Sequence, residues 1–221
     1  IYSGGQIYVN RQKYTTVNVA GFAIENNGII YNCHVVSKYE ENKSRAYFSG
    51  ENGLAVKFTN GNNTIEENLS SSMGVTSKVS GFVITNNSSI VNSRVGGKSY
   101  RHIIDIAGRE YARSETLDLF VLNGQGEVSG FVNENTSDAN ISSCKLDNVQ
   151  IYNKMNSTNS MTAGFVIRNQ SKIQGSYVQG KESFNSVTGE RSYAYIGSSI
   201  ATTGKVAGFV YQNSNLVKNC Y

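Results

Sequence analysis

The sequence contains no proline and no tryptophan, only two histidines and three cysteines, and charged residues make up just 16% of it. An odd number of cysteines disfavours a disulfide framework. The formal net charge of +4 is spread over both signs, without the clustered basic stripe that nucleic-acid binding requires, so we expect no nucleic-acid partner. No apolar run reaches the ~18 residues of a membrane-spanning helix, so we expect no membrane insertion.

The residues that are abundant favour strands and tight turns over helices. Asn, Ser, Gly and Tyr are frequent, and Val and Ile dominate the apolar residues. The chain begins at Ile1 without a leader and stops at Tyr221 inside a repeat. We therefore expect residues 1–221 to form a single domain that is a fragment of a longer chain.

One short phrase recurs five times along the chain. It reads "VAGFAIENNGIIYNCHV" at 19–35, "VSGFVITNNSSIVNSRVGG" at 79–97, "VSGFVNENTSDANISSCKL" at 128–146, "TAGFVIRNQSKIQGSYV" at 162–178 and "VAGFVYQNSNLVKNCY" at 206–221. Internal repeats of this kind indicate stacked repeat architectures, so each aligned position is called a column below.

The first part of the repeat predicts a strand. Glycine precedes every Phe, a small residue lies two positions before the Phe, and Ile is frequent two positions after it, which places these columns on one inward face. The Phe column is Phe22, Phe82, Phe131, Phe165 and Phe209, and the column two residues later is Ile24, Ile84, Asn133, Ile167 and Tyr211.

Two corners follow in every copy. The first is an Asn four residues after the Phe, a residue that suits turns because it tolerates left-handed backbone angles and hydrogen-bonds its own turn. A break in the two-residue periodicity then predicts a second corner at Asn32, Asn92, Ser143, Gly175 and Asn219, where positive φ is expected. A small column of Cys and Ser, from Cys33 to Cys220, comes directly after it.

These features predict an all-β protein, a right-handed parallel β-helix of roughly six to eight coils. The alternative is a β-sandwich with coincidental hairpins. Residues 54–69 are interpreted as a degenerate further coil, with Val56, Asn60 and Ile65 in the Phe, Asn and Ile positions. The remaining segments 36–53, 96–127, 147–161 and 179–205 are predicted to be loop insertions on one flank of the solenoid.

The pattern resembles the GLUG repeat. Gly81, Phe82, Val83, Asn86, Ile90, Asn92, Ser93 and Gly97 match that motif in order, with Phe in place of the family's Leu. The resemblance covers under half of the chain. It implies a non-catalytic repeat of large exported bacterial proteins (adhesins, toxins and IgA-specific metallopeptidases), and hence a secreted or bacterial cell-surface location and a role in virulence.

The sequence offers little catalytic chemistry. His34 is expected to face solvent, and His102 lies near Asp105 and Glu110 without metal-ligand or triad spacing. The cysteines share a small column with serines and are interpreted as buried side chains. We therefore expect no cofactor, no metal and no catalytic residue in this fragment.

An enzyme is the alternative function. Parallel β-helices also house glycoside-cleaving enzymes, which need paired carboxylates. The polar column Glu25, Thr85, Glu134, Arg168 and Gln212 mixes signs and is interpreted as a solvated rim. A carbohydrate-active lyase or glycosidase would instead use the insertions, where Asp105, Glu110, Glu115 and Asp118 cluster in sequence.

The insertions also carry many tyrosines and arginines, which are enriched in recognition surfaces. The alternative is that they only cover the solenoid flank. We expect a binding or spacer module whose loop flank meets a host glycan or surface protein, and whose terminal coils are capped by another segment or chain. The predicted ligand-binding residues are Tyr100, Arg101, Tyr111, Arg113, Tyr193 and Tyr195.

Overall fold

The computed structural model describes residues 6–11, 18–36, 55–60, 78–96, 99–106, 109–117, 120–124, 126–147, 149–153, 159–180, 183–184, 191–192, 195–198 and 204–221. Every regular element in these residues is a β-strand. Most strands stack into five parallel sheets, which we call walls 1 to 5 in the order in which the chain meets them.

Walls 1 to 3 each contain five strands. Wall 1 consists of β1 (Gln6–Arg11), β6 (Ala55–Asn60), β13 (Phe120–Gly124), β18 (Val149–Asn153) and β25 (Tyr195–Ser198). Wall 2 consists of β2 (Asn18–Ala20), β7 (Lys78–Ser80), β14 (Glu127–Ser129), β19 (Met161–Ala163) and β26 (Lys205–Ala207). Wall 3 consists of β3 (Ala23–Asn26), β8 (Val83–Asn86), β15 (Val132–Asn135), β20 (Val166–Asn169) and β27 (Val210–Asn213).

Walls 4 and 5 complete the cross-section. Wall 4 consists of β4 (Ile30–Tyr31), β9 (Ser89–Val91), β16 (Asn140–Ser142), β21 (Lys172–Gln174) and β28 (Val217–Lys218). Wall 5 consists of β5 (His34–Val36), β10 (Arg94–Gly96), β17 (Lys145–Asp147) and β22 (Tyr177–Gln179). Two antiparallel hairpins lie outside the walls: β11 (Ser99–Ile106) with β12 (Arg109–Leu117), and β23 (Ser183–Phe184) with β24 (Arg191–Ser192).

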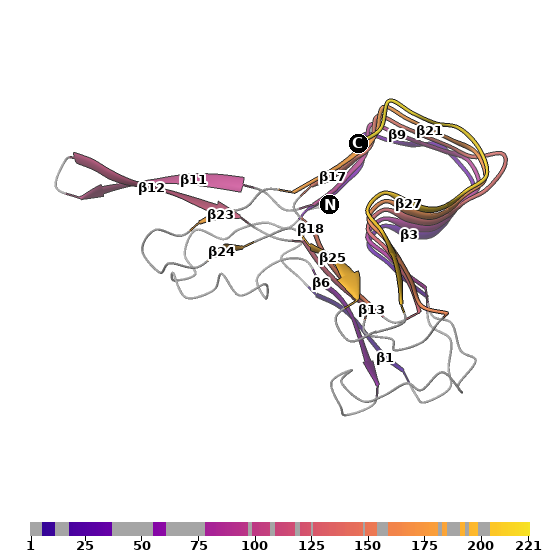
Figure 1. Cartoon of the computed structure of the whole chain (residues 1–221), viewed down its shortest axis with the longest axis horizontal. Coiled ribbons are helices and arrows are strands. Elements are labelled where there is room, and N and C mark those ends of the chain that lie inside the picture. The colour runs from indigo at the N-terminus through magenta and orange to yellow at the C-terminus, as the bar shows by residue number, and fades with distance from the viewer. Residues whose placement is uncertain are drawn as a thin grey trace.

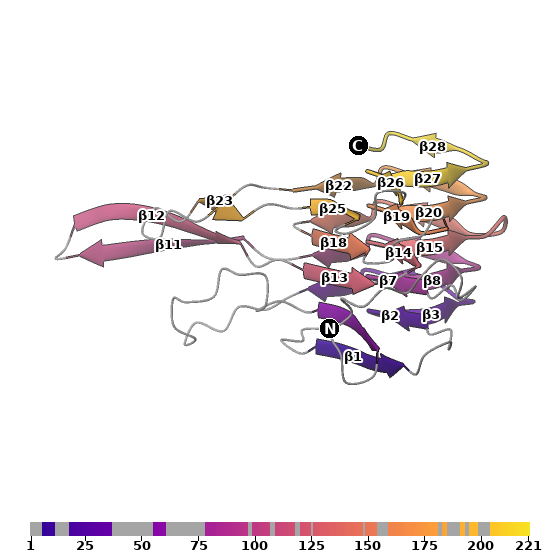
Figure 2. The same cartoon turned by 60° about the horizontal axis from the view of Figure 1, so that its bottom comes forward.

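The walls form a right-handed parallel β-helix. One passage through walls 1 to 5 makes one coil, and each strand pairs in parallel with its equivalent in the next coil. In Figure 1, which looks along the axis, the chain turns anticlockwise as it proceeds from the N-terminus to the C-terminus. Figure 2 shows that the C-terminal coils lie nearer to the viewer of Figure 1. An anticlockwise turn that advances towards the viewer is right-handed. The predicted fold class is therefore confirmed. The described strands form five coils rather than the six to eight expected.

A sharp bend at the Gly–Phe pair separates wall 2 from wall 3. A Cβ atom on Gly81 would meet the carbonyl oxygen of Gly130 in the next coil, closer than any real Cβ contact, and Gly21 and Gly130 face the same obstacle. The repeat requires glycine here because neighbouring backbones approach so closely. The phenylalanines that follow stack on one another, with ring centroids 4.7 to 4.9 Å apart.

This bend overturns one part of the predicted strand. Because the chain turns at Gly–Phe, the Phe and the residue after it both face the core, as Phe131 and Val132 do. The Ile column therefore lies outside the core cluster, although Ile84 and Ile167 are buried. The two-residue periodicity holds only along an unbroken strand, which explains the error.

The first corner is held by a ladder of asparagine side chains. Nδ2 of Asn26 donates to Oδ1 of Asn86 at 2.7 Å, and the same bond continues at 2.8 Å through Asn135, Asn169 and Asn213. Oδ1 of Asn26 also accepts a bond from Gly28 N, and Oδ1 of Asn169 accepts one from Ser171 N, so these two amides close their own turns as well. These asparagines do not have positive φ, so the ladder and the turn bonds, rather than a left-handed backbone, explain the residue.

The second corner has the positive φ that the sequence predicts. The values are 53° at Asn32, 49° at Asn92, 53° at Ser143, 57° at Gly175 and 54° at Asn219. The small residues that follow turn inward: Ser93, Cys144 and Ser176 are buried, and Cys33 and Cys220 at the ends are partly buried.

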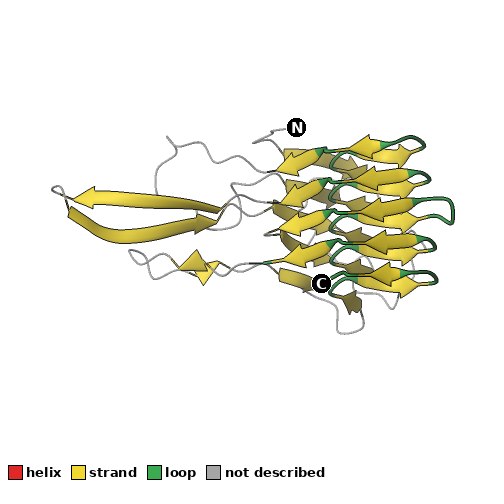
Figure 3. Cartoon of the chain, turned by 90° about the horizontal axis from the view of Figure 1, so that it is seen from above, coloured by secondary structure: helices red, strands yellow, loops and turns green. Residues whose placement is uncertain are grey.

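The insertions border wall 1 on both sides. Extra residues lie between walls 5 and 1, where the two hairpins emerge, and between walls 1 and 2, whereas the corners from wall 2 to wall 5 stay short in every coil (Figure 3). The predicted insertion flank is therefore the side that carries wall 1. The segments 96–127, 147–161 and 179–205 are not loops throughout, however, because each contributes a wall 1 strand.

Residues 54–69 do not form the predicted sixth coil. β6 belongs to wall 1, where Val56 aligns with Ile7 and Leu122 and not with the Phe column. Asn60 lies at the end of the same strand, and Ile65 lies outside the described residues.

Truncating one of the stacked phenylalanines tests the core. Phe82 is fully buried, so Phe82→Ala should lower the free energy of unfolding by about 3–5 kcal/mol, measured by denaturant titration. Phe209→Ala in the last coil is the matched control and should cost less, because Phe209 is only partly buried. Equal losses at the two positions would contradict the stacked core.

Candidate functional site

The β11–β12 hairpin carries four of the six predicted ligand-binding residues. Tyr100 and Arg101 lie in β11, and Tyr111 and Arg113 lie in β12. Figures 1 and 2 show this hairpin reaching away from the solenoid, and its second strand lies beside β23 of the other hairpin. The structure therefore brings these four residues together on one projecting element.

The last two predicted residues are not on this hairpin. Tyr195 begins β25, so it belongs to wall 1, where it pairs with Gln150 of the preceding coil. Tyr193 lies outside the described residues. The expected set of six thus reduces, in what the structure describes, to four residues on the hairpin and one in the wall.

The hairpin register also places the charged residues of this insertion. Arg101 lies opposite Glu115, and His102 lies opposite Ser114. Asp105 lies opposite Glu110, next to a register shift, near the end of the hairpin away from the solenoid. Asp118, the fourth acid of this cluster, lies outside the described residues.

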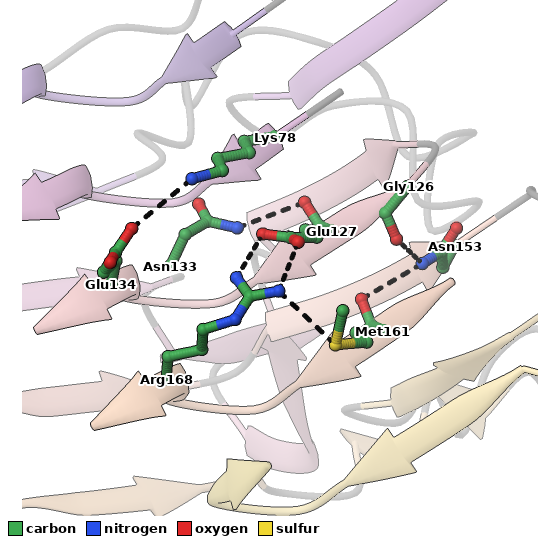
Figure 4. A network of polar contacts seen from close by, with 8 residues as sticks. All are labelled: Lys78, Gly126, Glu127, Asn133, Glu134, Asn153, Met161 and Arg168. Carbon is green, nitrogen blue, oxygen red and sulfur yellow. Dashed lines mark hydrogen bonds and ion pairs between the residues drawn. The ribbon is translucent and has the colours of Figure 1, made fainter. Parts of the chain in front are cut away.

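A second polar site, which the sequence did not reveal, lies in the angle between walls 2 and 3 (Figure 4). The Arg168 guanidinium donates from Nη1 and Nη2 to the two carboxylate oxygens of Glu127, at 2.7 and 2.6 Å. These hydrogen bonds raise the pKa of Arg168 above its ordinary value. Both oxygens of Glu127 are therefore engaged, and the pair joins the third coil to the fourth.

This pair corrects the interpretation of the polar column as a solvated rim. The Arg168 side chain is only 26% exposed and the Glu127 side chain 6%. Glu134 of the same column forms a longer ion pair with Lys78, 3.5 Å between Nζ and Oε2. Only the end members, Glu25 and Gln212, are exposed as predicted. The bidentate geometry makes the buried pair the stronger contact of the two.

Buried amides complete the network. Asn133 donates to the carbonyl of Glu127 at 3.2 Å, and Asn153 donates to the carbonyls of Gly126 and Met161. Within the described part of the chain, Oδ1 of Asn133 is buried without a hydrogen-bond partner. These amides thus hold backbone carbonyls at the start of wall 2, which is a structural role.

The three cysteines are free thiols, and only Cys144 is buried as the sequence predicts, whereas Cys33 and Cys220 in the end coils are partly buried. Burial raises the pKa of the Cys144 thiol to about 12, although hydrogen bonds with the backbone of Ser93 and Ser142 partly oppose this rise. His34 is exposed, also as predicted.

Within the described ranges, no three His, Cys, Asp or Glu side chains gather in a way that could hold a metal ion. No helix in those ranges is long and apolar enough to cross a membrane.

Comparison with protein-family models, with curated proteins and with solved structures finds no match for this chain.

Removing Arg168 should destabilise the coil stack. Arg168→Met leaves the buried Glu127 carboxylate without its ion-pair partner, so we expect a loss of about 1–3 kcal/mol in the free energy of unfolding. This loss is smaller than that for a fully buried pair because the arginine is partly exposed to solvent. Lys78→Met, which breaks the longer and more exposed ion pair, is the control and should cost under about 1 kcal/mol. Indistinguishable midpoints in a denaturant titration would disprove the assigned importance of the Arg168–Glu127 pair.

Thiol labelling tests the cysteine column. In the native protein at about pH 8, iodoacetamide should modify the partly buried Cys33 and Cys220 and leave Cys144 intact, because the buried thiol stays protonated. Peptide mass spectrometry of native and urea-unfolded samples measures the three sites separately. Rapid native labelling of Cys144 would show that the column is open.

Proposed function

We propose that this chain is a non-catalytic binding and spacer module of an exported bacterial protein, such as an adhesin, a toxin or a secreted peptidase. The module is secreted or held at the bacterial cell surface and presents its insertion flank to a host glycan or surface protein. Another segment or chain covers its terminal coils. The observation that carries this proposal is the β11–β12 hairpin, which projects from the insertion-bearing side of the solenoid, whereas the corners from wall 2 to wall 5 stay short.

The solenoid supplies rigidity and the hairpin supplies recognition. Loops and hairpins mounted on a rigid scaffold are the usual place for binding residues, and the stacked Phe and Asn columns tie each coil to the next. Export and a role in virulence are proposed from the resemblance of the repeat to GLUG repeats, which recur in large exported bacterial proteins.

Alanine substitution on the hairpin tests the binding role. The full chain is screened against arrays of host glycans and purified host surface proteins, and affinity is then measured for a variant with Tyr100, Arg101, Tyr111 and Arg113 replaced by alanine. We expect this variant to bind at least about 30-fold more weakly, because truncating a central Tyr or Arg of an interface can cost about 2 kcal/mol of binding free energy. Alanines at Glu25, Thr85 and Gln212, which share one column of wall 3, are the control and should change little. The assignment is wrong if the hairpin alanines leave the affinity unchanged while the wall 3 alanines abolish it.

A carbohydrate-active lyase or glycosidase is the second candidate, favoured by the register that sets Asp105 opposite Glu110. Paired carboxylates are the groups that cleave glycosidic bonds. The same glycans are incubated with the chain and assayed for new reducing or unsaturated ends. Turnover that disappears in Asp105→Asn and Glu110→Gln, with binding retained, would establish the enzyme and reject the non-catalytic module.

A further inference from the structure

The β11–β12 hairpin is a two-stranded ribbon that projects from the solenoid (Figures 1 and 2). Among the strands that the structure describes, β12 also lies beside β23, whereas β11 pairs with β12 alone and has a second edge that faces no strand. A strand edge of this kind can pair with a strand from another chain. A two-stranded ribbon is only marginally stable in water, so a further strand would also stabilise the hairpin.

β11 is long and regular for an edge strand. It spans 8 residues, Ser99–Ile106. The register shift of the hairpin places the extra residue, Tyr111, in β12, so β11 runs without a bulge. β11 also contains no proline and no lysine, which are the residues that often protect an edge from pairing. Its only charged residues are Arg101 and Asp105, so a partner strand has two charges to match.

The hairpin itself sets one of these charges against a like charge. Asp105 lies opposite Glu110, and like charges directly opposite each other destabilise an antiparallel pair. Arg101, by contrast, lies opposite Glu115. A partner strand that brings a basic residue beside Asp105 would offset the repulsion within the hairpin.

A second copy of β11 supplies that basic residue. A two-fold axis at Ile103 pairs β11 with β11 of the other copy in antiparallel orientation, and residues at equal distances on either side of Ile103 then lie opposite each other. Arg101 of each copy therefore lies opposite Asp105 of the other, so the interface contains this pair of unlike charges twice. An axis at the neighbouring residue, His102 or Ile104, sets neither charge opposite the other.

The remaining positions of β11 are compatible with the same register. Tyr100 lies opposite Ile106 of the other copy, and His102 lies opposite Ile104. These four residues alternate with the charged ones along the strand, so they share the other face of the ribbon. An aromatic residue opposite a β-branched one stabilises an antiparallel sheet, so both faces of the ribbon favour the pairing.

We propose that two copies of this chain dimerise through the second edges of their β11 strands and form one four-stranded antiparallel sheet in the order β12–β11–β11–β12. The interface is isologous, because each β11 contacts its own counterpart, and the assembly therefore closes at the dimer. Because each hairpin projects from its solenoid, the two solenoids lie beyond opposite ends of the shared sheet (Figure 2). An unrelated or shifted strand leaves the charges of β11 unmatched, which makes the pairing specific. This proposal does not depend on the ligand of the hairpin.

Sedimentation velocity of the full chain between about 1 and about 100 µM tests the association. The mass should rise with concentration to that of a dimer and no further, because the two-fold interface is closed. A monomer at every concentration would overturn the proposal.

Charge exchange tests the register. Arg101→Asp and Asp105→Arg should each weaken dimerisation at least about 10-fold, because each sets like charges opposite each other twice in the interface. Asp105→Arg also removes the repulsion with Glu110, so its loss of dimer would not come from a weakened hairpin. An equimolar mixture of the two variants should recover the dimer, because every charge then faces an unlike one.

Two further variants separate the interface from the folding of the hairpin. Combining Arg101→Asp with Asp105→Arg in one chain exchanges the two charges and should restore dimerisation to that of the unmodified chain. Arg113→Asp makes the same change of charge in β12, away from the β11 edge, and should leave the dimer unchanged. The proposal is wrong if the mixture and the double variant both stay monomeric while the unmodified chain dimerises. It is also wrong if Arg113→Asp weakens the dimer as much as Arg101→Asp does.

Discussion

The close approach of neighbouring coils at the Gly–Phe bend is the constraint on which the rest of the structure depends. A carbonyl oxygen of the next coil occupies the space that a side chain would need at Gly21, Gly81 and Gly130. Coils this close hold equivalent residues in register, so identical side chains fall above one another. Flat rings then stack and amides then form a ladder, and both interactions need that fixed spacing.

The same register divides the cross-section into a constrained and a permissive part. From wall 2 to wall 5, every position of the inner coils faces a fixed partner above and below, and the corners keep their length apart from the two extra residues of the third copy. Wall 1 is entered and left through corners of variable length, so the chain can lengthen there without disturbing a column. The ion pair between Glu127 and Arg168 belongs to the constrained part, since it closes the angle between walls 2 and 3 across two coils.

Sequence reasoning succeeded where one residue type recurs in one column. The inward Phe column, the Asn at the first corner and the positive φ at Asn32 and its equivalents all followed from aligned copies, because each position allows few residue types. The inward assignment of the Ile column failed because a bend at Gly–Phe shifts the alternation of side chains. Wall 1 was missed because its strands have only loose similarity, although "QIYVN" at 6–10 and "QIYN" at 150–153 shared a detectable pattern.

The candidate site was less predictable than the fold. Tyrosine and arginine composition pointed to the insertion that holds the β11–β12 hairpin, but composition does not fix strand boundaries, so Tyr195 was assigned to a loop rather than to wall 1. The Glu127–Arg168 pair joins residues from different coils and unlike columns. Such a contact appears in no single copy of the repeat, and only the three-dimensional angle between the walls brings the two residues together.

The coil-by-coil construction also determines how the molecule yields to a mechanical load. Each coil contacts only its neighbours, so resistance is a sum of similar local steps rather than one global barrier. A pulling force applied at the chain ends would peel the outer coils one at a time, beginning at the last coil, where Val206 is 46% exposed whereas its equivalent Val19 in the first coil is buried. The inner coils, with partners on both faces, would be the last to open. The module would therefore extend in steps and keep its central coils folded under a load that has already released its end.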